Sequence, residues 1–140
     1  MENLDDVIAQ YHIAMDHFTR GDAGPAMELF SHRDDVTLGN PFGPFVRGWP
    51  QAVETLTAAA ARYREGEVVA FEPLARHVTG ELACIVEVER YRAKVGGSDP
   101  ASIGLRVTSV FRPEDGVWKL VHRHADPITT PQPTESVIQK

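Results

Sequence analysis

The sequence predicts an α+β fold in which helices from the first half of the chain pack on a curved antiparallel sheet from the second half. Two observations support it. Up to about residue 66, apolar side chains recur every three or four residues, the spacing of one helix face. From residue 68 onward the period changes to two, as in half-buried strands. The 140 residues are enough for one domain with a core of its own.

Three helices are expected in the first half of the chain. Residues 3–20 form the first helix, with Asn3 as its N-cap. Its apolar stripe consists of Leu4, Val7, Ile8, Tyr11, Met15 and Phe18. A second, shorter helix covers residues 25–30, and a third begins at Trp49 and is closed by Gly66. These helices can cover one face of a sheet.

A short strand and four long ones are expected, at residues 36–38, 68–78, 82–94, 103–112 and 117–126. The turn sequence PEDG separates the last two, so they form a hairpin with Phe111 opposite Trp118. The four long strands make a meander that can curve around the helices and leave a cavity. A single domain is expected over residues 1–127, and residues 128–140, which are rich in proline, are expected to form an extended C-terminal tail.

Charge and composition exclude several classes of partner. The net charge of −6 disfavours nucleic acid and anionic membrane surfaces, which both require a basic face. No apolar run approaches the roughly 18 residues that span a bilayer. Cys84 is the only cysteine and no signal peptide is apparent, so we expect a cytoplasmic protein without an intrachain disulfide.

Two stretches resemble the nuclear transport factor 2-like superfamily, in particular its SnoaL-like, ketosteroid-isomerase-like branch. They are VTLGNPFGPFVRGW at 36–49 and SVFRPEDGVWKLVHRHADP at 109–127. The second is similar to the end of the association domain of calcium/calmodulin-dependent protein kinases. The resemblance implies a cone-shaped barrel of three helices on a curved, mostly antiparallel sheet that encloses a pocket, commonly in a homodimer. It also implies binding or cofactor-free conversion of small organic molecules, or a role in assembly. The acidic and aromatic pair of ketosteroid isomerases has no match here.

The histidines near the end of the chain are the first candidates for chemistry. His122, His124 and Asp126 alternate along the last strand, so their side chains form one row on one face. A histidine beside a carboxylate can act as a general acid or base. Asp126 can orient His124 or take a proton itself. The alternative is a hydrogen-bonding seam that holds the sheet together.

The resemblance to the kinase domain places Glu87, Tyr91 and Ser109 on the face toward the pocket, together with the histidine row. The opposite face would then carry a mixed surface suited to solvent or a dimer partner: Arg106, Thr108, Val110, Lys119, Val121 and Arg123. A bulge of one residue would reverse this assignment. If Glu87 and Glu89 face inward, they indicate a polar pocket, because a buried carboxylate must be paired or solvated. If they face outward, they belong to an ordinary solvated strand.

Further candidates for ligand contact lie on the predicted helices, in the loop before the third helix and on the last hairpin: Tyr11, Met15, Phe18, Asn40, Trp49 and Trp118. For the three on the first helix, core packing is the leading explanation, because an apolar stripe at this spacing forms core more often than a ligand site. Asn40 precedes a proline, and its presence is explained as well by formation of a turn as by ligand binding.

No metal or cofactor is expected. The H-x-H pair could supply two imidazoles, but no third histidine has helpful spacing. No glycine-rich phosphate loop, nucleophile elbow, C-x-x-C pair or dinucleotide fingerprint occurs. The resemblance and the residues together predict a SnoaL-like pocket protein that binds a small, partly apolar organic molecule. Cofactor-free acid/base chemistry, such as isomerisation, cyclisation or hydration, would use the histidine row. The alternative is a non-catalytic homodimeric binding or assembly module that uses the convex sheet face.

Overall fold

The computed structural model describes residues 3–140, so the first two residues of the predicted domain lie outside the described part. The helices are α1 (Leu4–Phe18), α2 (Gly24–Leu29) and α3 (Trp49–Ala60), followed near the C-terminus by a short 3-10 helix, Thr134–Val137. The strands are β1 (Thr37–Gly39), β2 (Val46–Arg47), β3 (Tyr63–Val78), β4 (Ala83–Val95), β5 (Ala101–Glu114) and β6 (Val117–Asp126).

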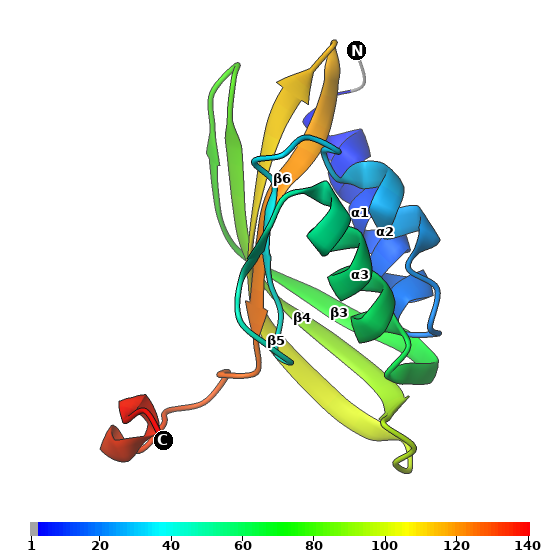
Figure 1. Cartoon of the computed structure of the whole chain (residues 1–140), viewed down its shortest axis with the longest axis vertical. Helices are drawn as coiled ribbons and strands as arrows, with labels where there is room; N and C mark the ends of the chain where they lie inside the picture. Colours follow the sequence, from blue (N-terminus) through cyan, green and yellow to red (C-terminus); the bar gives the residue numbers. More distant parts are fainter. Residues whose placement is uncertain (1–2) are drawn as a thin grey trace.

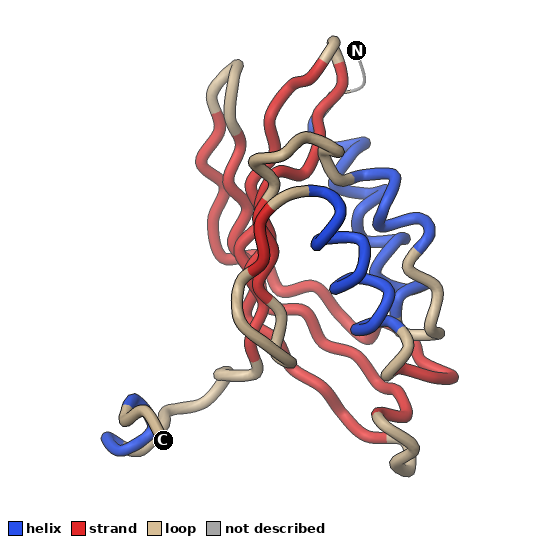
Figure 2. The backbone as a smooth tube through the Cα atoms, viewed as in Figure 1, coloured by secondary structure: helices blue, strands red, loops and turns tan. Residues whose placement is uncertain are grey.

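The strands form one curved sheet in the order β2-β1-β6-β5-β4-β3. All neighbouring strands are antiparallel except β1 and β6, which are parallel. The three α-helices lie on one face of this sheet, and the other face is free of them (Figures 1 and 2). We call the helix-covered face the inner face and the other the convex face. The predicted α+β fold is confirmed.

Local sequence explains where the helices begin and end. The Oδ1 atom of Asn3 accepts a hydrogen bond from the N–H of Asp6 (2.9 Å), the N-cap expected for α1. The third helix ends at Ala60, earlier than predicted, and Tyr63 already begins β3. Gly66 lies in this strand, where a side chain would collide with the carbonyl oxygen of Thr19 at 2.4 Å. This glycine therefore permits close contact between β3 and the end of α1 rather than closing a helix.

The hairpin of β5 and β6 has a shorter turn than expected. Asp115 and Gly116 both have positive φ, at 52° and 79°, which is typical of a two-residue type I′ turn. Phe111 consequently pairs with Leu120 instead of Trp118. One residue further, Val110 pairs with His122, so Val121 is an extra residue in β6. This β-bulge exchanges the two faces of β6 for every residue that follows it.

The core lies between the inner face of the sheet and the helices. Its largest fully buried side chains include Tyr11, Phe30, Leu38, Phe111 and Leu120. The Glu89 carboxylate is buried among them with no exposed surface. Since a buried charge requires a partner, the arrangement around Glu89 organises the site described below.

Beyond β6 the chain leaves the body of the domain and ends in the short 3-10 helix (Figure 1). A domain boundary at residue 127 stays a prediction. None of the helices within residues 3–140 is long and apolar enough to cross a membrane.

Candidate functional site

A small cavity lies between the inner face of the sheet, the end of α1 and one side of α3. We call it the inner cavity. Its apolar walls are formed by Phe18, Leu38, Phe42, Leu56, Ala59 and Leu105, and its polar lining by Asn40, Tyr63, Tyr91 and Arg123. The space open to the centre of a water molecule is about 20 Å³. In this closed form the inner cavity holds about one water molecule.

The floor of the inner cavity is the exposed edge of a buried polar cluster that consists of Tyr11, Glu89, Tyr91 and Arg123. Arg123 donates from Nη2 to Glu89 Oε1 (2.9 Å) and from Nε to the hydroxyl oxygen of Tyr11 (2.8 Å). The hydroxyls of Tyr11 and Tyr91 both donate to the Glu89 carboxylate. Every member is at least nine-tenths buried, so the ion pair is shielded from solvent.

The surroundings of the cluster set its protonation states. Burial raises the pKa of Tyr11 and of Tyr91 well above the usual range, more than the neighbouring Arg123 lowers it. Burial alone would lower the pKa of Arg123, but Tyr11 and Glu89 outweigh it and raise that pKa. At neutral pH Arg123 therefore carries its positive charge, and Tyr11 and Tyr91 are neutral.

Two polar groups of the inner cavity have no protein partner. Arg123 uses Nε and one N–H of Nη2, and no described residue accepts a hydrogen bond from Nη1. The hydroxyl of Tyr63 likewise has no partner within residues 3–140. Every fully buried side-chain nitrogen or oxygen atom in this range has a hydrogen-bond partner. Because Nη1 of Arg123 and the hydroxyl of Tyr63 have none, both atoms have some accessible surface. Both residues line the inner cavity.

The loop between β1 and β2 closes the inner cavity on its outer side. The N–H of Phe42 donates to Asn40 Oδ1 (2.9 Å), which shapes the loop as a turn. The ring of Phe42 lies 6.0 Å from that of Tyr63, measured between centroids. The Arg62 guanidinium lies over the Phe42 ring, with its carbon 4.4 Å from the ring centroid. Asn40 thus serves both roles weighed from the sequence, as a turn residue and as part of the cavity lining.

The predicted catalytic row does not face this cavity. His122, His124 and Asp126 lie on the convex face, because the bulge at Val121 reverses the side-chain alternation in β6. Their predicted position on the pocket face is wrong, and Arg123, predicted to point outward, points inward instead. The row has no cavity-lining member among the described residues.

On the convex face the row makes ordinary surface contacts. His122 Nδ1 forms a hydrogen bond with Thr37 Oγ1 (2.8 Å), and burial, assisted by His124, lowers the His122 pKa. Asp126 accepts a hydrogen bond from Arg106 Nε (2.7 Å). Although burial opposes it, this bond keeps the pKa of Asp126 below its usual value. The ring of Phe45 covers both histidines, with centroids 6.0 and 5.3 Å away.

The other predicted inward residues of the sheet do lie on the inner face. Glu87 is buried and hydrogen-bonded to His12 Nε2 (3.0 Å), but it does not line the inner cavity. Ser109 is buried in the core, and Tyr91 lines the cavity and belongs to the polar cluster. The facing of β4 and β5 that the resemblance implied is therefore correct.

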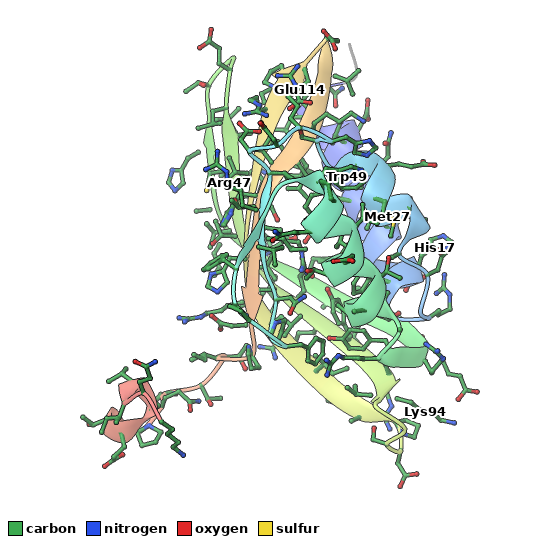
Figure 3. All side chains as sticks on the ribbon, in the orientation of Figure 1. His17, Met27, Arg47, Trp49, Lys94 and Glu114 are labelled. Atoms are coloured by element: carbon green, nitrogen blue, oxygen red, sulfur yellow. The ribbon has the colours of Figure 1, made fainter. Side chains whose placement is uncertain are left out.

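Of the predicted helix and loop contacts, Phe18 and Asn40 line the inner cavity, whereas Met15 is buried in the core. Tyr11 takes part through the polar cluster. Trp49 opens α3 (Figure 3). Its ring stacks on that of His32, with centroids 3.9 Å apart, and it does not line the inner cavity. Trp118 is buried near the hairpin turn and also lies outside it.

Sequence reasoning missed Arg123, Tyr63 and Leu105. One signal was available for Arg123. A glutamate expected to face inward at position 89 needs a buried cation, and Arg123 lies on the strand that also carries the candidate histidines. Within residues 3–140 there is no group of three or more His, Cys, Asp or Glu side chains that could hold a metal ion.

Comparison with known proteins gives a family match over most of the chain. The model of the SnoaL-like domain matches residues 5–129. No curated protein matches this chain.

Solved structures share the fold at low sequence identity. A proposed dehydratase of the NTF2-like family from Streptomyces avermitilis is 20% identical over 91% of this chain and 94% of its own, with a TM-score of 0.74. An NTF2-like superfamily protein from Salmonella enterica serovar Typhimurium is 20% identical over 96% and 93%, with a TM-score of 0.74. A proposed calcium/calmodulin-dependent protein kinase type II association domain from Thiobacillus denitrificans is 13% identical over 91% and 97%, with a TM-score of 0.72. These likenesses establish the fold. The family match confirms the SnoaL-like resemblance predicted from the sequence.

Proposed function

Because this chain belongs to the SnoaL-like domain family, we propose that it binds a small, partly apolar organic molecule in the inner cavity. The supporting observation is the polar cluster on the cavity floor. Replacing a buried ion pair by apolar residues of similar volume is often neutral or stabilising. Folding alone therefore gives no reason to keep Arg123 and Glu89 beneath an apolar cavity, whereas recognition of a ligand does.

The closed cavity admits a ligand only when its outer wall moves. That wall is the loop between β1 and β2, with the half-buried ring of Phe42 facing the cavity. A shift of this short loop would enlarge the space without disturbing α1 or the long strands.

The lining favours binding over acid/base catalysis. No carboxylate or imidazole belongs to the described lining of the inner cavity. Glu89 is the carboxylate of the polar cluster below, and its oxygens already accept bonds from Arg123, Tyr11 and Tyr91. An isomerase, cyclase or hydratase would need a base that is free to take a proton. We therefore place binding first and cofactor-free catalysis second, within a cytoplasmic protein.

A cavity-filling variant tests the proposal. Ala59 lines the inner cavity from α3 and is buried, while Ala61 at the end of the same helix is exposed. Small cyclic molecules that raise the melting temperature of the wild-type protein should lose this effect in Ala59→Leu and keep it in Ala61→Leu. If Ala59→Leu binds the same molecules with unchanged affinity, the inner cavity is not their site.

We also propose that two copies associate through the convex face. This face presents half-buried or exposed side chains that no helix covers: Phe45, Val86, Val88, Thr108, Val110, His122 and His124. Phe45 has 60% of its surface exposed although it is a large aromatic residue. A sheet face that leaves such side chains uncovered is suited to contact with another protein surface.

The oligomeric state checks this second proposal. A charge introduced at the centre of the convex face, Val88→Arg, should convert a dimer into a monomer in light scattering coupled to gel filtration. Ile13→Arg, at an exposed position on the helix side, is the matched control and should not change the mass. A wild-type monomer at high concentration would contradict the proposal.

A further inference from the structure

The inner cavity offers hydrogen-bond donors to whatever occupies it. Nη1 of Arg123 can only donate, and the hydroxyl of Tyr63 is unpartnered within the described residues. Both side chains belong to residues that are more than nine-tenths buried, with exposed fractions of 7% and 4%. Burial raises the pKa of Tyr63, more than the nearby Arg123 lowers it, so its hydroxyl keeps its proton at neutral pH.

The two donors border one small space. The volume open to a water centre is about 20 Å³, the size of about one water molecule. Arg123 and Tyr63 both line this space. Apart from Asn40 and Tyr91, the other lining residues are apolar. They include Phe18 and Phe42, whose ring centroids each lie 6.0 Å from that of Tyr63.

The charge of the polar cluster decides between a neutral and an anionic acceptor. Glu89 already neutralises Arg123 through a 2.9 Å hydrogen bond. A second carboxylate in the same dry site would bring a net negative charge beside Glu89, and an unbalanced buried charge is strongly disfavoured. A neutral carbonyl oxygen has two lone pairs and adds no charge.

We infer that the inner cavity recognises its ligand through a neutral carbonyl oxygen that accepts hydrogen bonds from Arg123 Nη1 and the Tyr63 hydroxyl. The carbonyl takes the place of a water molecule and reproduces its contacts, so little is lost on displacement. The apolar walls then hold the hydrocarbon part of the molecule. This inference rests on the proposed binding function and names the chemical class of the ligand.

Three probes of similar size separate the chemistry: acetophenone with a neutral carbonyl, benzoate with a carboxylate, and ethylbenzene with neither. Their dissociation constants would be measured by NMR titration on the wild-type protein and on Tyr63→Phe. That variant keeps the ring and removes a hydroxyl that bonds to no described residue, so the fold is retained. The carbonyl stretch of bound acetophenone, recorded by infrared difference spectroscopy, reports its hydrogen bonds directly.

Acetophenone should bind more tightly than either other probe. Tyr63→Phe should weaken it by about threefold to tenfold, the effect of one neutral hydrogen bond, and should leave ethylbenzene unchanged. Its carbonyl stretch should move to higher frequency in the variant because one donor is gone. Benzoate binding more tightly than acetophenone would overturn the preference for a neutral group. Equal binding of ethylbenzene, or no effect of Tyr63→Phe, would overturn carbonyl recognition but leave ligand binding intact. If none of the three binds, the proposed function fails and the inference fails with it.

Discussion

Removing the cation of the buried polar cluster should destabilise the protein strongly. In Arg123→Met the Glu89 carboxylate loses its ion pair at a position with no exposed surface. Leaving one charge of a buried pair without its partner typically costs about 3–5 kcal/mol of unfolding free energy. Because a domain of this size has roughly 5–15 kcal/mol in total, the variant should still fold at 25 °C but unfold at much lower urea concentration.

A double-mutant cycle separates the charge from the lost packing. Glu89→Gln alone leaves Arg123 without its anion, but Nη1 borders the inner cavity and water can reach it, so a smaller loss of about 1–3 kcal/mol is expected. Combining both substitutions removes both charges. The double variant should therefore lose about 2 kcal/mol less unfolding free energy than the sum of the two single losses.

Urea denaturation followed by circular dichroism at neutral pH measures all three variants. Arg106→Met is the control, since Arg106 also pairs with a carboxylate, that of Asp126, but is exposed on the convex face. It should leave the urea midpoint close to that of the wild-type protein, because an exposed ion pair contributes little to stability. The reasoning is refuted if Arg123→Met costs no more than this control, or if the double variant loses the full sum of the single losses.

Three further predictions concern other parts of the molecule. The pKa values of Tyr11 and Tyr91 are raised in the folded state. Above pH 10 the folded chain therefore keeps protons that the unfolded chain releases. The free energy of unfolding should fall above that pH by about 1.4 kcal/mol per pH unit for each tyrosine. Absorbance at 295 nm should show these tyrosines ionising only on unfolding, and ionisation near pH 10 in the folded protein would contradict this. Gly66→Ala should lose about 1–3 kcal/mol in thermal or urea unfolding because its methyl group meets the carbonyl oxygen of Thr19, and an unchanged stability would show that the strand can shift. Asp126→Asn lies on the convex face and should leave the affinity of cavity ligands unchanged in the same NMR titrations; a marked loss would return this residue to the site.

The secondary structure was largely readable from the sequence because it depends on local patterns. The apolar stripe of α1 placed Phe18 on the inner side, and the alternation in β4 placed Glu87 and Tyr91 on one face. The turn sequence ending in Asp-Gly marked the hairpin. Such features need only neighbouring residues, and a regular period carries them along a whole element.

The candidate site was harder to predict because one extra residue in β6 decides which side chains reach the cavity. No glycine or proline marks the bulge at Val121. Without it, His122 and His124 would face the helices and Arg123 would face outward. The structure places Arg123 against Glu89, which removes the predicted acid/base row from the cavity and puts a donor there instead.

The sequence by itself therefore determined the α+β architecture, the order of its elements and which residues of β4 share a face. Only the tertiary structure decided which residue neutralises Glu89 and which donors remain free for a ligand. The physical reason is that hydrophobic period is a property of one strand, whereas register and bulges arise from the pairing of two. A buried charge then selects its partner among the side chains that this pairing brings to the same face.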